Sequence, residues 1–422
     1  MTSTTRSFAL LGVSTVPVTV EVDLLRRLPS VAIVGMPAVA VREAADRVRS
    51  AMLACGMDFP RQRVVVSLSP ADLRKDGTGF DLSIAAAIMI AADRMKPLPD
   101  DYVLYGELTL GGEVRPVRGA AVFAKDHPDL TLVCSVEMAQ QVVEMGGRAI
   151  GIRTLGQLMD LPPLTQKESR VNPCREYGPS TTLDFKDVKG LPASVTDALV
   201  EAAVNRTPIL FVGSPGCGKT MLAARLPGLL PPMTENEVRE VTAIQAAAGL
   251  HHEFSVTSTR PFRAPHHSIS PAGMIGGALL RPGECCLAHH GVLFLDEVSE
   301  FPRQVMEVLP SKHKDKEIVL NRVGGRITFP TDYWLVMAAN PCSCGNFGHP
   351  TRPCVCSGEM KERYQARIDS ALPKGTKIIH LDPIPAAVLL GDTQGPTTED
   401  LRLRVGVLRQ LQAEVQIGTS PA

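Results

Sequence analysis

The residues best suited to chemistry lie in the run Gly213-Ser-Pro-Gly-Cys-Gly-Lys-Thr220, which follows the apolar stretch Ile209 to Val212. Glycines let a backbone wrap around phosphate groups with several N–H groups pointing inward. Lys219 can then reach the terminal phosphates, and the Thr220 hydroxyl can bind Mg2+. A strand, this loop and a helix from about Met221 together predict a P-loop. A Gly/Pro-rich surface turn would explain the glycines but not the Lys-Thr pair. The predicted phosphate-binding residues are Gly213, Ser214, Pro215, Gly216, Cys217, Gly218, Lys219 and Thr220.

A second segment, Gly291-Val-Leu-Phe-Leu-Asp-Glu-Val298, has four apolar residues followed by two carboxylates. A buried parallel strand delivers such acids to the carboxyl edge of its sheet. There, Asp296 would hold Mg2+, and Glu297 would orient and deprotonate an attacking water. Taken alone, the segment fits a strand with an acidic turn equally well. The P-loop upstream favours the catalytic interpretation.

Composition narrows the class of protein. With 422 residues, 44% hydrophobic and 21% charged, the chain is long enough for two or three globular domains. The formal net charge is zero, so nucleic-acid binding would need a local basic patch. The sequence contains neither an apolar run long enough to span a membrane nor a signal-peptide core after Met1 to Arg6. We therefore expect a cytoplasmic protein.

Hydrophobic periodicity divides the chain into a mixed α/β region, a polar linker and the P-loop module. Strands are expected at 18–22, 31–34 and 63–68, and helices at 39–55 and 82–92. The linker, rich in proline, charge and Ser/Thr, covers 162–182, and the P-loop module begins at Leu183. An amphipathic helix is expected at 398–414.

Four of the ten cysteines form the pairs Cys342-x-Cys344 and Cys354-x-Cys356. Clustered cysteines favour a metal over disulfides, and four thiolates could hold Zn2+ tetrahedrally. The one-residue spacing within each pair is shorter than that of zinc knuckles, so a compact reduced turn is the alternative.

A basic segment lies between the acidic strand and Asn340. Two strand-like runs around Gly324-Gly325 predict a β-hairpin. Its flanks carry the candidate DNA contacts Lys312, Lys314, Lys316, Arg322 and Arg326. Such a hairpin in the pore of a ring would contact a phosphate backbone. A solvated loop is an equally good interpretation, and Arg322 could instead serve the nucleotide of a neighbouring subunit.

Along almost its whole length the chain resembles the ComM/YifB-type magnesium-chelatase-like AAA+ ATPases. The motifs that carry this resemblance in the first part are Val20-Glu-Val-Asp23, Ile33-Val-Gly-Met-Pro37, Ala40-Val-Arg-Glu43, Ser69 to Leu82 and Val114-Arg-Pro-Val-Arg-Gly119. In the second part they are Lys219-Thr-Met-Leu-Ala223, Arg260-Pro-Phe-Arg-Ala-Pro-His-His-Ser268, the acidic strand and Asn340-Pro-Cys-Ser-Cys-Gly345.

The resemblance implies an α/β chain with an N-terminal Lon-protease-like α+β domain followed by a P-loop AAA+ α/β domain of the magnesium-chelatase type. The implied boundaries are 1–160 for the Lon-like domain, 161–182 for the linker, 183–385 for the ATPase domain and 386–422 for a remnant of the truncated helical lid. Lon-type proteases use a serine and a lysine, but the positions concerned fall on Gly79 and Ala121. The domain is therefore expected not to be a protease.

In this family, an asparagine at the end of the strand before the cysteines helps to position water against the terminal phosphate. The resemblance gives this role to Asn340, which would otherwise be a turn residue before Pro341.

The chain departs from the family after Arg363-Tyr-Gln-Ala-Arg367, where an arginine is expected to reach the next subunit's active site. Leu372-Pro-Lys-Gly-Thr-Lys377 places Gly375 there instead, and a second arginine in the lid is not recognisable. Such an arginine can contribute several orders of magnitude in rate. The sequence thus supports binding of ATP and Mg2+ more firmly than rapid hydrolysis.

The resemblance implies a ring, expected to be a hexamer, that uses ATP for DNA branch migration in natural transformation. A hydrolysis-deficient or truncated ATP-binding scaffold is one alternative. The other is a metal-chelatase motor subunit, against which the N-terminal domain is an argument.

Overall fold

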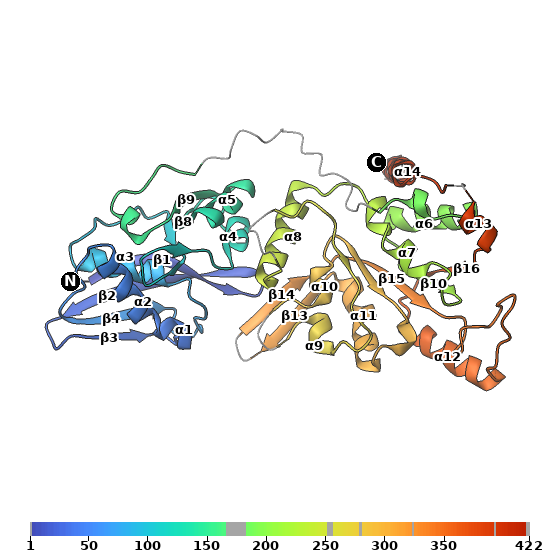
Figure 1. Cartoon of the computed structure of the whole chain (residues 1–422), viewed down its shortest axis with the longest axis horizontal. Helices are drawn as coiled ribbons and strands as arrows, with labels where there is room; N and C mark the ends of the chain where they lie inside the picture. Colours follow the sequence, from blue (N-terminus) through green and yellow to red (C-terminus); the bar gives the residue numbers. More distant parts are fainter. Residues whose placement is uncertain are drawn as a thin grey trace. The chain divides into compact units, whose positions relative to one another are not determined.

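The computed structural model describes residues 2–165, 183–250, 256–277, 281–322, 325–391 and 394–418. The chain divides into two compact units, both of which mix helices and strands (Figure 1). The first comprises Met1–Cys174, Val238–Thr257 and Asn321–Ile327, and the second comprises Arg175–Glu237, Ser258–Leu320 and Thr328–Ala422. Most of the expected linker, residues 166–182, lies outside the described part of the chain.

The first unit contains a four-stranded sheet in the order β1-β2-β4-β3. Its strands are β1 (Thr2–Leu11), β2 (Ser14–Leu25), β3 (Ser30–Val34) and β4 (Arg63–Ser69). β1 with β2 and β2 with β4 pair antiparallel, whereas β3 runs parallel to β4. In β4, every second residue is fully buried, so one face of the strand contacts the core. The three strands expected in this region are confirmed.

Helix α3 (Asp81–Ala91) is almost wholly buried because its residues are apolar or small on every side. This confirms the expected apolar helix. The helix expected at 39–55 is divided at Glu43 into α1 (Val39–Arg42) and α2 (Ala44–Ala54). The remaining helices of the unit before the linker are α4 (Ala120–Asp126), α5 (Val136–Glu144) and the 3-10 helix η1 (Leu155–Leu158).

Two smaller sheets complete this part of the first unit. One is parallel, in the order β5-β8-β9, and the other is the antiparallel pair β6-β7. Their strands are β5 (Tyr102–Leu104), β6 (Glu107–Leu108), β7 (Val114–Arg115), β8 (Thr131–Ser135) and β9 (Arg148–Ile152). α5 packs beside β9, and the Ser135 side chain accepts from the Met138 backbone N–H at its N-terminus.

The second unit contains a five-stranded parallel sheet in the order β11-β12-β15-β10-β16. Its strands are β10 (Ile209–Gly213), β11 (Phe262–Arg263), β12 (Val292–Leu295), β15 (Trp334–Ala339) and β16 (Lys377–Leu381). β12 and β15 are buried at every residue, as expected of strands covered on both faces. β13 (Glu317–Arg322) and β14 (Gly325–Pro330) form a separate two-stranded sheet, which confirms the expected hairpin.

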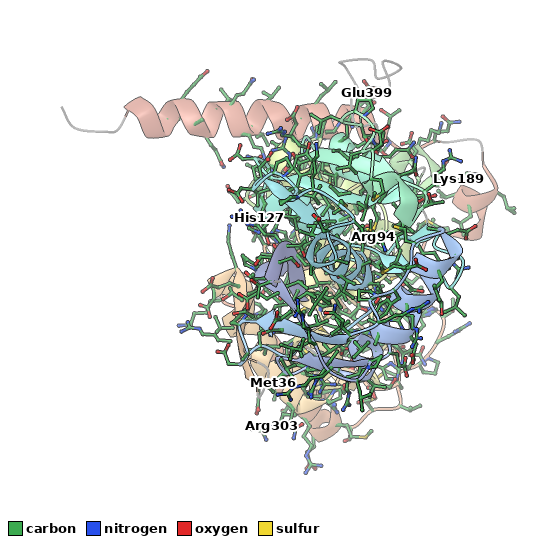
Figure 2. The ribbon with its side chains drawn as sticks, turned by 90° about the vertical axis from the view of Figure 1, so that its left-hand side faces the viewer. Met36, Arg94, His127, Lys189, Arg303 and Glu399 are labelled. Atoms are coloured by element: carbon green, nitrogen blue, oxygen red, sulfur yellow. The ribbon has the colours of Figure 1, made fainter. Side chains whose placement is uncertain are left out.

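The α-helices that begin in the second unit are α6 (Ala193–Asn205), α7 (Lys219–Ala223), α8 (Glu235–Ala248), α9 (Pro271–Ile275), α10 (Glu284–Leu287), α11 (Arg303–Asp315), α12 (Gly358–Ala371), α13 (Ala386–Leu390) and α14 (Thr398–Gly418). Short 3-10 helices lie at η2 (Phe185–Asp187), η3 (Leu226–Leu229) and η4 (Val298–Glu300). α14 packs on α6 and extends beyond the expected 398–414. Figure 2 shows it as one continuous helix that begins near Glu399. Among the residues that the structure describes, no helix has both the length and the apolar character needed to cross a membrane.

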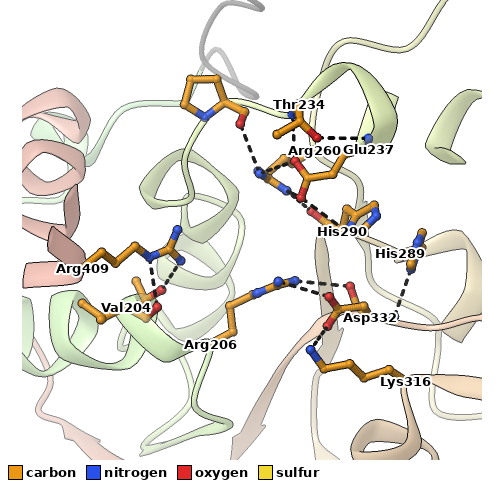
Figure 3. Close-up of polar contacts among 12 residues, drawn as sticks. Val204, Arg206, Thr234, Glu237, Arg260, His289, His290, Lys316, Asp332 and Arg409 are labelled. Atoms are coloured by element: carbon orange, nitrogen blue, oxygen red, sulfur yellow. Dashed lines mark hydrogen bonds and ion pairs between the residues drawn. The ribbon is translucent and has the colours of Figure 1, made fainter. Parts of the chain in front are cut away.

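Charged side chains form a network at the amino edge of the five-stranded sheet (Figure 3). Arg260 is 6% exposed and donates to the backbone carbonyls of Pro231, at 2.6 Å, and His290, at 2.6 Å. It also pairs with Glu237 at 3.2 Å. Burial lowers the pKa of Arg260, although Glu237 opposes this effect.

The same network continues at Asp332, two residues before β15. Its carboxylate pairs with Arg206 at 3.1 Å and with Lys316 at 3.2 Å, and its N–H donates to His289 at 3.0 Å. Burial acts to raise the pKa of Asp332, but Arg206 and Lys316 bring that pKa below its ordinary value. These ion pairs tie the starts of neighbouring strands together.

Candidate functional site

The predicted P-loop connects β10 to α7 at the carboxyl edge of the parallel sheet. Gly218 precedes α7 with a left-handed φ of 91°, which glycine adopts without strain. A Cβ atom at Gly216 or Gly218 would meet nothing within 4 Å, so the loop borders open space. The expected helix begins at Lys219, two residues earlier than the sequence suggested.

Lys219 is the first residue of α7, and its ammonium is directed at oxygens that lie at or just after the ends of β10 and β15. Its Nζ donates to the carbonyl of Gly213 at 2.5 Å, to that of Ser214 at 3.2 Å and to Oδ1 of Asn340 at 3.0 Å. The residue is 8% exposed. A largely buried ammonium held by neutral oxygens is well placed to accept an anionic ligand.

Asp296 follows β12, and its Oδ2 accepts from the Thr220 hydroxyl at 2.8 Å. Hard oxygen donors of this kind suit Mg2+, so the pair fits the expected metal. Glu297 is exposed and has a left-handed φ of 52°, so the chain turns immediately after the strand. The turn presents the two adjacent carboxylates at the end of β12.

The three polar strand ends meet in one cavity of about 330 Å3. It is lined by Pro215, Gly216, Gly218, Lys219, Thr220, Met221, Asp296, Glu297 and Asn340. This clustering follows from the sheet order, because β10 and β12 both pair with β15, which carries Asn340 at its end. The candidate catalytic residues Lys219, Glu297 and Asn340 are therefore brought together.

A second, mostly apolar cavity of about 540 Å3 shares Gly216, Gly218 and Met221 with the first. Its walls include segments far apart in the sequence, residues 187–192 before α6 and residues 380–385, which comprise the end of β16 and the residues that follow it. Its size falls in the range of small-molecule sites. Sequence reasoning missed these residues, because an apolar Gly/Pro run has no signature of its own.

The four clustered cysteines converge in the loop between β15 and α12. The Sγ atom of Cys342 lies 3.4 Å from that of Cys344 and 3.7 Å from that of Cys354, and the latter two are 3.7 Å apart. Cys356 belongs to the same group, in which all the ligand atoms lie within 4.8 Å of one another. Tetrahedral zinc with Zn–S bonds of about 2.3 Å places its sulfurs about 3.8 Å apart. The thiols thus fit a zinc ion.

One of these thiols is readily ionised. A hydrogen bond with the backbone of Asn346, with others from the loop, lowers the pKa of Cys344 to about 6. His349 is engaged differently, since its Nδ1 accepts from the N–H groups of Thr351 at 3.2 Å and Arg352 at 3.1 Å. The histidine thereby closes a turn of the loop.

The candidate DNA contacts are divided between helix α11, the two strands β13 and β14, and Lys316, which lies between α11 and β13. Lys312 and Lys314 belong to α11, whereas Arg322 ends β13 and Arg326 lies in β14. The side chains of Lys312, Lys314 and Arg322 lie outside the described part of the structure. Arg326 is exposed, while Lys316 pairs with Asp332 and so already has an anionic partner.

Gly375, at the position expected for an intersubunit arginine, lies in the turn between α12 and β16 with a φ of 82°. The nearby Arg367 on α12 donates to the Phe301 carbonyl at 3.4 Å.

The positions implied for a proteolytic dyad have no room for one. A Cβ atom at Gly79 would lie 2.2 Å from two ring atoms of Tyr105, whose ring stacks on Phe8 with centroids 4.0 Å apart. Ala121 is fully buried within an apolar cluster. Aromatic packing occupies the space that a nucleophile would need.

Two family models match the sequence. The model described as magnesium chelatase, subunit ChlI, matches residues 184–379, and the one described as subunit ChlI of Mg-chelatase matches residues 20–134. Similar proteins include competence protein ComM of Haemophilus influenzae, with 36% identity over 97% of this chain and 82% of that protein. YifB of Escherichia coli is 34% identical over 97% of this chain and 81% of that protein. Rv2897c of Mycobacterium tuberculosis is 37% identical over 97% of this chain and 82% of that protein.

Proposed function

Since the chain belongs to the ComM/YifB magnesium-chelatase-like family, we propose that it is a P-loop ATPase of the AAA+ type. One observation carries this proposal. Lys219 at the start of α7, Asp296 just after β12 and Asn340 just after β15 border a single cavity beside the P-loop. ATP would place its phosphates there, with Mg2+ on Thr220 and Asp296 and with Glu297 as the base for water.

The adjoining apolar cavity would hold the nucleotide base. Val188 and Leu191 on one side and Leu381 and Ile384 on the other offer apolar faces to a purine ring. The shared residues Gly216 and Gly218 would then lie where base and phosphates join. ATP binding with low-micromolar affinity, measured with a fluorescent analogue, would support both parts of the site.

We propose DNA as the macromolecular partner, by analogy with the competence protein that the chain resembles. The basic residues of α11 and the β13–β14 hairpin would contact phosphates in a homo-oligomeric ring, expected to be a hexamer. The test measures the rate of ATP hydrolysis without DNA, with single-stranded DNA and with forked DNA. We expect the rate to be higher when DNA is present. ATP binding without DNA-stimulated turnover would favour a scaffold instead.

A salt titration tests the DNA contacts themselves. Neutralising Lys312 and Lys314 together should weaken DNA binding whatever its sequence. Each lost phosphate contact should reduce the slope of log affinity against log salt by about 0.7 on single strands. Arg303→Ala is the matched control, because Arg303 begins the same helix and points outward (Figure 2), and it pairs with Glu307 of that helix. An unchanged slope would make the segment a solvated surface.

The first unit, we infer, is a non-proteolytic domain of the Lon type. The packed aromatic rings at Gly79 support the absence of proteolysis. Incubation with casein and ATP should give no fragments, and serine-directed probes should leave Ser67, Ser69 and Ser83 unlabelled.

A metal-chelatase motor is the second candidate, because the descriptions of both matching models name a chelatase subunit. One of these models matches residues 20–134, so the presence of an N-terminal domain does not by itself argue against this alternative. ATPase stimulation by a porphyrin rather than by DNA would favour it.

The cysteine cluster would hold a structural zinc ion, since its sulfur separations approach those of a tetrahedral site. Elemental analysis of the purified protein should find about one zinc per chain, lost on replacing Cys342 and Cys354.

A further inference from the structure

The cysteine loop begins directly at a residue of the nucleotide site. Asn340 directly follows β15 and accepts from Lys219, and the first thiol of the cluster, Cys342, follows two residues later and is fully buried. Only Pro341 separates the two, so a displacement of Cys342 is transmitted to Asn340 through a restrained backbone. The cluster and the amide that faces the phosphate region are thus one continuous segment.

The loop also packs on the P-loop. Gly345 has a φ of 76°, and a Cβ atom there would lie 2.9 Å and 3.0 Å from side-chain carbons of Pro215. The Gly345 N–H donates to the carbonyl of Cys342 at 2.9 Å. The close approach therefore requires both glycine and the turn that the cysteines form. The P-loop and the thiol cluster support each other through this contact.

The far end of the loop returns to the same asparagine. Cys356 is followed by Ser357, whose hydroxyl accepts from the Met360 N–H and begins α12. Tyr364 on that helix lies beside the backbone of Asn340: burial raises the pKa of the tyrosine, the Asn340 backbone acts to lower it, and the Tyr364 hydroxyl accepts from Ser299 at 3.3 Å. Ser299 lies in η4, immediately after the carboxylates of β12. Asn340 is therefore held from both ends of the cysteine loop.

We propose that metal binding by Cys342, Cys344, Cys354 and Cys356 positions Asn340, so that metal loading determines how well the site distinguishes ATP from ADP. The inference rests on the proposed ATP-binding function. Asn340 contacts Lys219 and so would lie beside the terminal phosphate, which ATP has and ADP lacks. The apolar cavity and the P-loop N–H groups would hold the base and the other phosphates, which both nucleotides have. Without the metal, no bond would hold the four sulfurs together, and the loop would lose that constraint. The cysteines and Tyr364 are positioning residues, since none of them lines the cavity.

The test compares ATP and ADP affinities rather than turnover. Fluorescent ATP and ADP analogues are titrated into the full chain before and after zinc removal with a chelator selective for zinc over magnesium, and again after zinc is returned. We expect zinc removal to lower the ATP-to-ADP affinity ratio about tenfold, the size of one charge-assisted hydrogen bond, and zinc return to restore it. ADP affinity should change much less.

Two substitutions give the same answer by different routes. Cys344→Ser with Cys354→Ser should lose zinc and lower the affinity ratio. Tyr364→Phe should keep zinc and its fold by circular dichroism, yet also lower the ratio, because it removes the hydroxyl that lies beside the Asn340 backbone and is bonded to Ser299. Phe347→Ala is the matched control, since this side chain lies in the same loop but is 52% exposed. If the cysteine variant fails to fold, Tyr364→Phe and reversible zinc removal still test whether the cysteine loop positions Asn340.

The outcomes separate this inference from the proposed function. Absence of ATP binding in the zinc-loaded wild type would overturn the proposed function. Normal ATP binding with an unchanged affinity ratio in both zinc-free protein and Tyr364→Phe would overturn the positioning role alone. Purified, folded protein that contains no zinc and takes none up would overturn the metal site.

Discussion

The two edges of the five-stranded parallel sheet hold buried charges in opposite ways. At the amino edge, Arg260 and Asp332 are engaged by protein partners: carbonyls, Glu237, Arg206 and Lys316. At the carboxyl edge, Lys219 contacts only neutral oxygens among the described residues and faces a cavity. A charge satisfied by its neighbours stabilises the fold, whereas one left without an ionic partner is available to a ligand. Substitutions at the two edges should therefore have separable effects.

The largest expected effect is a loss of ATP turnover on substitution at the carboxyl edge. Glu297→Gln keeps the shape of the side chain but removes the base, so turnover should fall by about 10² to 10⁴. ATP should still bind, and the melting temperature should stay near that of the wild type because Glu297 is exposed. Steady-state hydrolysis and analogue binding measure the two quantities, with Glu300→Gln as the neighbouring control. Wild-type turnover in the Glu297→Gln variant would remove the assigned base.

A substitution at the amino edge should lower the free energy of unfolding rather than the rate of turnover. Arg260→Met removes one member of a buried pair and leaves Glu237 without its guanidinium partner, at a cost of about 3 to 5 kcal/mol. ATP affinity of the remaining folded protein should be unchanged. Urea unfolding followed by analogue titration measures both, and Arg352→Met at an exposed loop position is the control. A large loss of ATP affinity without loss of stability would contradict the division between the edges.

Lys219→Ala should weaken ATP binding by about a hundredfold, the contribution of a charged hydrogen bond to phosphate. Its effect on stability should be small, because its present contacts are neutral carbonyl and amide oxygens. Titration with a fluorescent ATP analogue measures the change, with Lys374→Ala as the exposed control. Unchanged affinity would exclude a P-loop role for this lysine.

The smallest expected effect is the pH dependence that Asp332 gives to the stability of the fold. The folded pKa of Asp332 lies below its ordinary value, so its contribution to stability is present above the unfolded pKa of about 3.9 and is lost as pH falls through the folded pKa. Asp332→Asn should therefore cost about 1 kcal/mol at pH 7, with the difference shrinking in acid. Denaturant unfolding at pH 7 and below pH 4 measures it. A difference that grows in acid would contradict the sign.

Much of the carboxyl edge could be predicted from local sequence. The P-loop glycines, Lys219, the acidic strand and the apolar run before Asn340 all carry signals within a few residues, because a strand and its adjoining loop are encoded together. The hairpin at β13 and β14 was recognised for the same reason. The ion pair of Lys316 with Asp332 was not predicted, since the two residues lie in different connecting segments, one before β13 and the other before β15.

Sequence alone thus determined the identity and order of the strand ends and the chemistry that each could supply. Only the tertiary structure decided the strand order that unites them, the apolar cavity between residues 187–192 and 380–385, and the contact of Gly345 with Pro215. The same holds for the closed network around Arg260. Local propensities and motifs act over a few residues, whereas contacts between distant segments depend on how the whole sheet and its covering helices pack.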